Sequence, residues 1–272
     1  MARKASNSRK AAVGKRGAAF PGLLEEMTVE EVRSFKPRVA VVALGSTEPH
    51  GPHLPYGTDT WQVTRLCRLG VEWANARGAK ALLYPTLPIT NNVNMKKFPF
   101  ALRIGVRTLM TVLLDLATQV REDGVGKLVI VNGHGGNPGA IMAAQREMAG
   151  MEGMPFVCWA SDLKPEDFKS PIEHGSDHAG ESETSRMMWI RPDLVREHKF
   201  ANNPLGTLKV KALRRAQFVR PWHLYMPQSA GGETRKSSAA KGKAVIEAEA
   251  RGLADLLVEL DKAKLDARFP YA

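Results

Sequence analysis

The sequence predicts an α/β protein built around a largely parallel sheet. Two observations support this prediction. From residue 20 onward, short runs of β-branched and aliphatic residues alternate with longer stretches whose apolar residues recur at helical spacing, as in consecutive strand-helix units. In addition, nearly all of the unusual polar residues come directly after predicted strands, where sheets of this kind bind their ligands.

The expected elements follow one another in a regular order. Four apolar runs predict strands at 38–44, 80–87, 127–131 and 155–159. Stretches with one apolar helical face predict helices at 60–76, 102–120, from Pro138 onward, and at 244–265. The sequence contains no internal repeat and no low-complexity linker after residue 20, so we expect residues 20–272 to form one domain.

Positive charge is concentrated in two parts of the chain. Among 272 residues, 39 Lys+Arg face 28 Asp+Glu, a formal net charge of +11, and residues 1–17 hold six of these cations and no acid. We expect residues 1–19 to be a disordered basic tail, because they are too poor in apolar residues to fold. The alternative is an arm for nucleic acid, which the absence of an aromatic residue for base stacking disfavours. A second basic stretch, 209–241, could bind an acidic partner or an anionic substrate.

The composition excludes several classes of protein. Two cysteines, Cys67 and Cys158, cannot build a disulfide framework, and neither belongs to a C-x-x-C pair that would suggest a zinc site. No apolar run approaches the roughly 20 residues that span a bilayer, and the first residues lack the apolar segment of a secretory signal. We therefore expect a cytoplasmic protein that is not inserted in a membrane.

Three polar loops hold the candidate functional residues. They span 45–60, 132–137 and 177–185, and their imidazole and carboxylate groups are Glu48, His50, His53, Asp59, His134, His178, Glu181 and Glu183. Such ligands suit Zn²⁺, Mn²⁺ or Fe²⁺, whereas Ca²⁺ would need an all-oxygen site. Two ions about 3.5–4 Å apart that share a carboxylate can hold a hydroxide and polarise a carbonyl. Hydrolysis is therefore the leading chemistry.

Each loop also has a simpler interpretation. Glu48 and His50 could be loop residues hydrogen-bonded to the backbone, and His134 could belong to a phosphate-binding loop. Glu181 and Glu183 could simply open a helix, whose dipole favours acidic residues in the first turn. Pro138 stands where a dinucleotide-binding G-x-G-x-x-G motif needs its third glycine, which argues against the phosphate loop. No G-x-S-x-G motif supports a nucleophilic serine. The conjunction of three loops, all after strands, favours the metal site.

Together the three loops resemble the creatininase family of metal-dependent amidohydrolases. The matching stretches are Gly45-Ser-Thr-Glu-Pro-His-Gly-Pro-His-Leu-Pro-Tyr-Gly-Thr-Asp, Asn132-Gly-His-Gly-Gly-Asn and His178-Ala-Gly-Glu-Ser-Glu-Thr-Ser, in the order and separation of the family. The resemblance runs from about Gly22 through the final helix. It implies a three-layer Rossmann-like sandwich, a two-metal site, hydrolysis of a C–N bond in a small cyclic or linear amide, and a homo-oligomer, expected as a hexamer.

The resemblance also implies the metal ligands. Carried over by position, Glu48, Asp59 and His134 would hold one divalent ion. His50 and Asp59 would hold the second ion, so that Asp59 bridges the two.

One position departs from creatininase itself. That enzyme completes its second ion with a glutamate two residues after the loop histidine, where this chain has Gly136. Glu183, or else Glu181, is the candidate for the missing carboxylate, and otherwise the second ion is weak or absent. The Gly135-Gly136 pair also removes residues that shape the creatinine pocket, so we do not expect creatininase activity. Branches with this loop include a deformylase acting on a ribosylated pyrimidine phosphate and a peptidase that trims a modified peptide.

We expect a metal-dependent amidohydrolase, acting on carbon–nitrogen bonds other than peptide bonds, in which a metal-bound hydroxide attacks the amide carbonyl of a small molecule. His178 or Glu183 would carry the proton to the leaving nitrogen. The candidates for substrate contacts are His53, Asn132 and Glu181.

Two alternatives stay open. A deformylase or peptidase of the same family could bind a phosphorylated substrate through Arg214, Arg215 or Arg220. A catalytically silent protein could instead use its basic tail for nucleic acid, although nucleic acid is not the expected partner.

Overall fold

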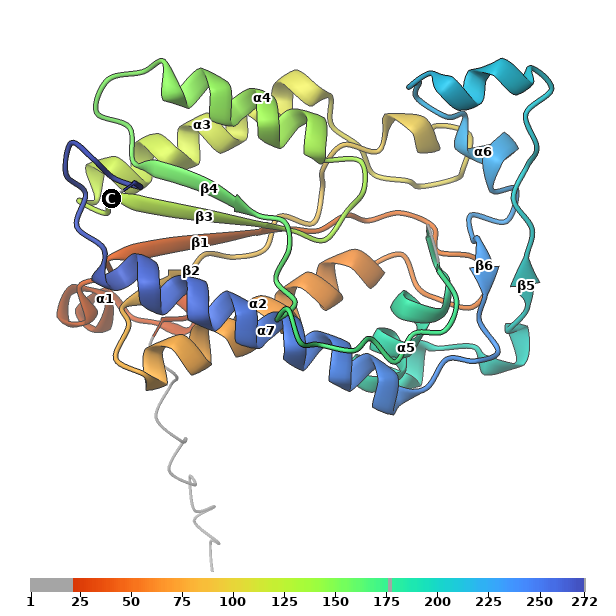
Figure 1. The fold of residues 1–272 in the computed structure, drawn as a ribbon, viewed down its shortest axis with the longest axis horizontal. Helices are drawn as coiled ribbons and strands as arrows, with labels where there is room; N and C mark the ends of the chain where they lie inside the picture. Colours follow the sequence, from red (N-terminus) through yellow and green to blue (C-terminus); the bar gives the residue numbers. More distant parts are fainter. Residues whose placement is uncertain (1–21, 176–177, 272) are drawn as a thin grey trace, which may run out of the picture.

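Four parallel strands form the centre of the molecule in the computed structural model, which describes residues 22–175 and 178–271 (Figure 1). The strands lie in the order β2-β1-β3-β4. Their bounds are β1 Val39–Leu44, β2 Ala81–Leu83, β3 Lys127–Asn132 and β4 Phe156–Ala160. The expected basic tail, 1–19, lies outside the described residues.

Helices cover both faces of this sheet, which confirms the predicted three-layer α/β architecture. The layer below the sheet in Figure 1 contains α2 (Thr58–Ala76), α5 (Glu181–Ile190) and α7 (Ala239–Lys262). The layer above it contains α3 (Val106–Glu122) and α4 (Pro138–Ala149).

Smaller elements connect these layers. The short helices are α1 Val29–Phe35 and α6 Trp222–Tyr225, and the strands β5 Asn202–Asn203 and β6 Gly232–Glu233 pair antiparallel. The 3-10 helices are η1 Leu24–Glu26, η2 Val93–Met95, η3 Pro192–Leu194, η4 Glu197–Lys199 and η5 Lys211–Arg215. Among the described residues, no helix combines the length and the apolar composition that crossing a bilayer requires.

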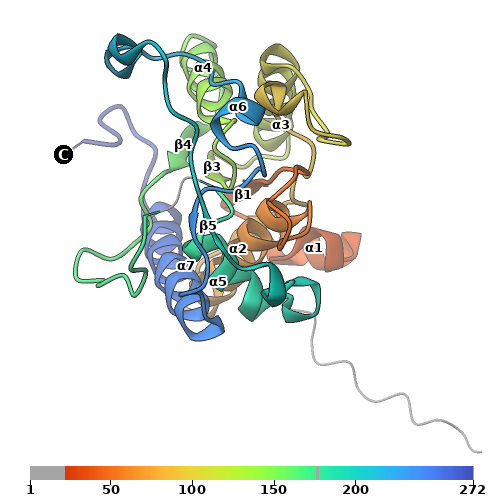
Figure 2. The same ribbon diagram turned by 90° about the vertical axis from the view of Figure 1, so that its right-hand side faces the viewer.

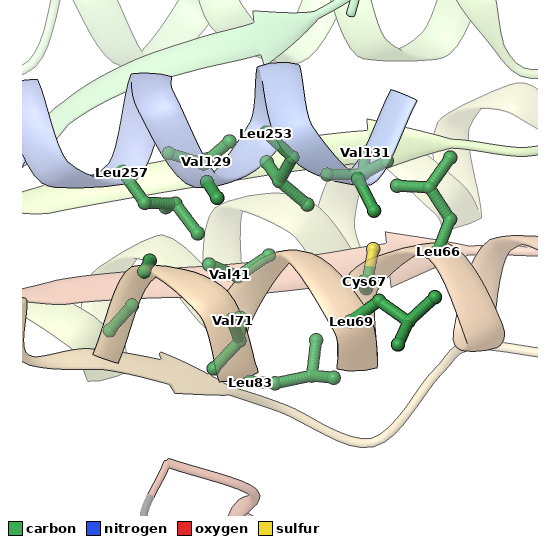
Figure 3. Packing of buried hydrophobic residues seen from close by; sticks show 14 of the residues in the cluster. Val41, Leu66, Cys67, Leu69, Val71, Leu83, Val129, Val131, Leu253 and Leu257 are labelled. Atoms are coloured by element: carbon green, nitrogen blue, oxygen red, sulfur yellow. The ribbon is translucent and has the colours of Figure 1, made fainter. Parts of the chain in front are cut away.

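The core follows from the alternation of side chains along the buried strands. In β1, Val41 and its i±2 neighbours pack with α2 and α7, whereas Val42 and its i±2 neighbours pack with α3 and α4. Figure 3 shows the first of these clusters, where Leu253 and Leu257 of α7 meet Val129 of β3 above Val41. Because β1 is buried on both faces, its six residues are all apolar.

The observed boundaries differ from the predicted ones for local reasons. Strand β2 ends at Leu83, well before residue 87, because Pro85 has no N–H to donate to a ladder. Helix α7 begins five residues before the expected start, where the Ser238 hydroxyl accepts a hydrogen bond from the Lys241 backbone N–H.

The order of the strands indicates where the binding crevice lies. Strand β1 lies between β2 and β3, so the chain runs from β1 to β2 on one side and then crosses back past β1 to β3 on the other side. Ligands of open α/β sheets bind at such a reversal, outside the carboxyl ends of the strands. The loops that follow β1 and β3 emerge there.

Candidate metal centre

Four segments bring their polar side chains together at this reversal. Glu48 and His50 come from the loop after β1, Asp59 from the first turn of α2, and His134 from the loop after β3. Glu183, in the first turn of α5, completes the cluster. The first four are buried, and the Glu183 side chain is 26% exposed. The three predicted loops therefore meet in space.

Asp59 lies between two histidines. Its Oδ1 is 3.0 Å from His50 Nε2, and its Oδ2 is 3.0 Å from His134 Nδ1. The carboxylate thus directs one oxygen into each half of the cluster. This is the geometry expected of a carboxylate shared by two ions.

Backbone carbonyls fix the tautomers of both rings. His134 Nε2 lies 3.1 Å from the carbonyl oxygen of Asn91, and His50 Nδ1 lies 3.0 Å from that of Glu48. A carbonyl can only accept, so these two nitrogens carry the hydrogens. In neutral rings, His134 Nδ1 and His50 Nε2 are therefore lone pairs that face carboxylates. Metal-binding histidines are oriented in this way by their second nitrogen.

The arrangement leaves carboxylate oxygens of the cluster without hydrogen-bond donors. His134 Nδ1 is 3.0 Å from both Glu48 Oε1 and Asp59 Oδ2, and even a protonated ring has only one hydrogen there for the two oxygens. Glu48 Oε2 is buried without a hydrogen-bond partner among the described residues. Three triads of described residues hold ligand atoms within 4.8 Å of one another, namely Glu48-Asp59-His134, His50-Asp59-Glu183 and Glu48-His50-His178. The residues present therefore fit two divalent cations.

The same excess of negative charge shifts the pKa values of the histidines in the cluster. Burial alone would lower the pKa of His50, but the carboxylates of Asp59, Glu183 and Glu48 outweigh it and raise the pKa to about 10. The pKa of His134 is raised for the same reason, against burial, chiefly by Glu48. Burial opposes ionisation of Asp59, yet His50 and His134 hold its pKa below the usual value. The cluster favours a positive charge at its centre.

Glu183 is the third carboxylate of the cluster, beside His50, and Gly136 supplies none. Its Oε2 lies 3.7 Å from His50 Nε2 and accepts a hydrogen bond of 2.6 Å from the Ala179 N–H. A Cβ at Gly136 would lie 2.2 Å from the Asn91 carbonyl oxygen and 2.4 Å from His134 Nε2. A glutamate at 136 is therefore excluded by this backbone, because it would displace the carbonyl that orients His134.

His178 borders the cluster. Its Nε2 lies 2.9 Å from the Pro49 carbonyl oxygen, so the hydrogen is on Nε2 and Nδ1 is free, 3.7 Å from Glu48 Oε1. Burial, together with the neighbouring His50, lowers the pKa of His178. The ring of Trp222 packs edge-on against it at 5.5 Å and 83°.

The three expected substrate residues have other partners. Buried Glu181 accepts hydrogen bonds from the backbone N–H groups of residues 173 and 174 and pairs with Lys241 at 2.7 Å. His53 Nε2 lies 3.0 Å from the Thr184 hydroxyl, and burial lowers its pKa to about 4. Asn132 donates to the His134 carbonyl oxygen and so shapes the loop, but it also lines the pocket described below.

Two residues that contribute to the site belong to no motif in the sequence. Asn91 acts through its backbone carbonyl, and Trp222 stands inside the basic stretch with no motif around it. Arg214 and Arg215, considered for a phosphorylated substrate, lie exposed in η5.

A pocket of about 380 Å³ opens beside the cluster, a volume typical of small-molecule sites. His134 and Glu183 form part of its wall, and its charged groups are Asp162, Lys164, Arg186 and Glu249. Gly135 also lines it, and no atom lies within 4 Å of the position that a Cβ would take there. A side chain at 135 would therefore enter this space.

Comparisons with known proteins agree with the geometry. The creatininase family model, described as creatinine amidohydrolase, matches residues 25–257. The mycofactocin precursor peptide peptidase of Mycolicibacterium smegmatis is 33% identical over 181 residues, which cover 66% of this chain and 68% of that protein. The creatinine amidohydrolase of Pseudomonas putida is 26% identical over 242 residues, covering 81% and 89%.

Solved structures give the same result. A crystal structure from Bacteroides fragilis named for creatinine amidohydrolase matches with a TM-score of 0.81 at 28% identity, covering 91% of this chain and 99% of that one. A manganese form of creatininase, at 23% identity, matches with a TM-score of 0.69 over 89% and 99% of the two chains and supports the fold. The chain belongs to the creatininase family and is an amidohydrolase acting on carbon–nitrogen bonds.

Proposed function

We propose that the chain hydrolyses an amide at a two-metal centre. Glu48, Asp59 and His134 would hold one ion, and His50, Asp59 and Glu183 the other. The observation that carries this proposal is the position of Asp59, with one oxygen 3.0 Å from each histidine. The mixed imidazole and carboxylate set suits Zn²⁺, Mn²⁺ or Fe²⁺.

The chain's own residues have distinct tasks in this proposal. Two divalent ions, when bound, would supply polarisation of the amide carbonyl and a lowered pKa of bound water. His178 is placed to move the proton, because its Nδ1 is free while Nε2 is held by the Pro49 carbonyl. Since Glu183 serves as a ligand, His178 rather than Glu183 would return the proton to the leaving nitrogen.

Metal content tests the ligand assignment. After loading with Mn²⁺ and gel filtration, elemental analysis should find two ions per chain in the wild type and one in Glu183→Gln. Ser182→Ala changes the neighbouring residue of the same helix and should keep two. A wild type without metal, or a Glu183→Gln variant with two ions, would contradict the assignment.

We further propose that the substrate is a linear amide larger than a single small ring. The pocket beside His134 and Glu183 supports this, because the glycine at 135 leaves it open. A linear N-acyl compound, rather than creatinine, fits such a space. The relative from Mycolicibacterium smegmatis, a peptide peptidase, is consistent with this choice.

Filling the pocket tests the substrate class. Gly135→Phe should keep two metal ions but lose at least tenfold in kcat/KM, about 1.4 kcal/mol, on the best substrate of a panel of linear amides. Gly139→Phe is a matched control, because a Cβ at Gly139 also meets no atom within 4 Å and Gly139 does not line the pocket. Equal activity of the two variants would exclude this pocket.

The proposal retains a cytoplasmic location and a homo-oligomeric assembly, hexameric by the family resemblance. Nucleic acid is not part of it.

A further inference from the structure

The pocket beside the metal cluster has a charged wall that the proposed function leaves unused. Arg186 follows Glu183 by three residues on α5, so both side chains lie on one face of the helix, and both line the pocket. Glu249 of α7 and Lys164, which follows the end of β4, complete this wall. Helices α5 and α7 run side by side in Figures 1 and 2, which brings Glu249 to Arg186. One pocket therefore joins the metal cluster to these charges.

Hydrogen-bond donors outnumber acceptors in this wall. Both terminal nitrogens of Arg186 donate to Glu249, at 2.9 and 2.7 Å, and the Arg186 Nε–H is buried without a partner among the described residues. Lys164 Nζ is 3.8 Å from Glu249 Oε1, which is too far for a hydrogen bond. One carboxylate thus faces two cations. A second anion would use the donors that remain, and hydrogen bonds between charged groups are the strong ones.

Apart from the cluster residues, one further charged residue lines the pocket, and it does not cancel this excess. Asp162 is exposed, so water and salt screen its carboxylate, whereas the side chains of Arg186 and Glu249 are only 16% and 12% exposed. The Lys164 side chain is 44% exposed and long enough to turn toward a ligand. The wall therefore suits a carboxylate.

The same pocket has an apolar side. Val63 and Leu66 of α2 and Val131 of β3 line it. An amide at the metal cluster, an apolar group against these side chains and a carboxylate at Arg186 are the three parts of an amino acid acylated on its nitrogen. In such a compound the carboxylate carbon is three bonds from the amide carbon. This short span suits Glu183 and Arg186, because residues three apart on a helix have Cβ atoms about 5–6 Å apart.

We infer that the substrate is a linear N-acyl amino acid with an apolar side chain, and that Arg186 and Lys164 bind its carboxylate. The inference rests on the proposed function for the position of the amide. In the reaction, water adds to the acyl carbon and the C–N bond breaks. The acyl part leaves as a carboxylic acid, and the nitrogen takes the proton, which gives the free amino acid. Arg186 and Lys164 take no part in these bond changes and determine specificity only.

Titration calorimetry with two matched probes tests the carboxylate site. N-acetyl-L-leucine and N-acetyl-L-leucinamide differ only in the carboxylate, and treating the full chain with a chelator prevents that carboxylate from binding a metal ion. The wild type should bind the acid at least tenfold more tightly than the amide.

Variants of the two cations locate the preference. The double variant Lys164→Gln, Arg186→Lys removes one cation and the spare guanidinium N–H groups but keeps a positive partner for Glu249, and its preference for the acid should fall at least fivefold. Lys164→Gln alone, an exposed change, should lower the preference about threefold. Lys169→Gln, the same change at an exposed lysine outside the pocket lining, is the control and should keep the wild-type preference.

Several results would overturn the inference: equal binding of the two compounds by the wild type, no measurable binding of either, or an unchanged preference in Lys164→Gln and the double variant. A preference for the acid that arises only after loading with Mn²⁺ would also overturn it, because the ions would then hold the carboxylate. Hydrolysis by the Mn²⁺-loaded wild type separates the two proposals. If the chain binds the acid as expected but hydrolyses neither compound, the proposed function fails while the carboxylate site stands.

Discussion

Two clusters of buried charge lie at opposite ends of the same sheet. At the carboxyl end, Glu48, Asp59 and Glu183 face histidines whose N–H groups are already given to backbone carbonyls. At the amino end, Asp261 pairs with Arg38 and accepts the Lys80 backbone N–H at 3.0 Å.

In the second cluster, at the amino end of the sheet, the charged groups find their partners within the chain. Lys127, the first residue of β3, donates its ammonium group to the carbonyls of Leu260 and Ala263 at the end of α7. Arg38 and the Lys80 N–H lower the pKa of Asp261 against the effect of burial. Each charge therefore has its partner. The comparison shows that burial and charge alone do not mark a site: the carboxyl end differs because its carboxylates exceed the donors that the chain provides.

The largest expected effect is on catalysis. Asp59→Asn removes the shared ligand and should reduce amide hydrolysis at least 1000-fold, about 4 kcal/mol in the barrier, as measured by steady-state kinetics. Asp261→Asn, the same change at the amino end, should leave kcat within about twofold. Comparable losses in both variants would contradict the distinction between the two clusters.

The next effect is on thermal stability. Because an ion binds only the folded site, Mn²⁺ at about 100 times its Kd should add about 2.7 kcal/mol, roughly 5–10 °C in Tm for a domain of this size. Calorimetry with Mn²⁺ and after chelation measures the shift. Asp59→Asn should show almost none, and an equal shift in that variant would place the ion elsewhere.

A smaller effect is expected at the amino end. Lys127→Met leaves two helix-terminal carbonyls without their donor and should lower the free energy of unfolding by about 2 kcal/mol, with metal content unchanged. Urea unfolding measures the difference. Lys262→Met, an exposed change in the last turn of α7, should stay within about 0.5 kcal/mol. Loss of metal from Lys127→Met would show that the two ends are not independent.

The smallest effect depends on pH. The folded pKa of Asp261 is lowered, so its ionised form stabilises the protein above the unfolded pKa of about 3.9, and this stability is lost as pH falls through the folded value. Asp261→Asn should therefore be about 1 kcal/mol less stable at pH 7, a modest figure because Arg38 is half exposed. The gap should close below about pH 4 in urea unfolding, and a gap that widens there would refute this.

The sequence predicted the residues that stand at strand ends. Glu48, His50, Asp59 and His134 follow β1 and β3, and the parallel sheet brings those loops together. Whether Glu181 or Glu183 joins them depended on helix geometry. Two residues apart on α5, their side chains point in different directions, and only Glu183 reaches His50.

Other parts of the site could not be predicted from residue type. The Asn91 carbonyl orients His134, and any residue has a carbonyl. Trp222 reaches His178 only because the chain returns through α6 after the exposed residues 204–221. Strand β2 ends early because Pro85 has no N–H to donate, whereas the apolar run around Pro85 predicted a longer strand.

Anomalous diffraction from crystals grown with Mn²⁺ tests the central claim most directly. We predict two peaks per chain, one among Glu48, Asp59 and His134 and one among His50, Asp59 and Glu183, with Asp59 between them. A single peak with Glu183 turned away, or no peak near Asp59, would contradict the two-metal centre.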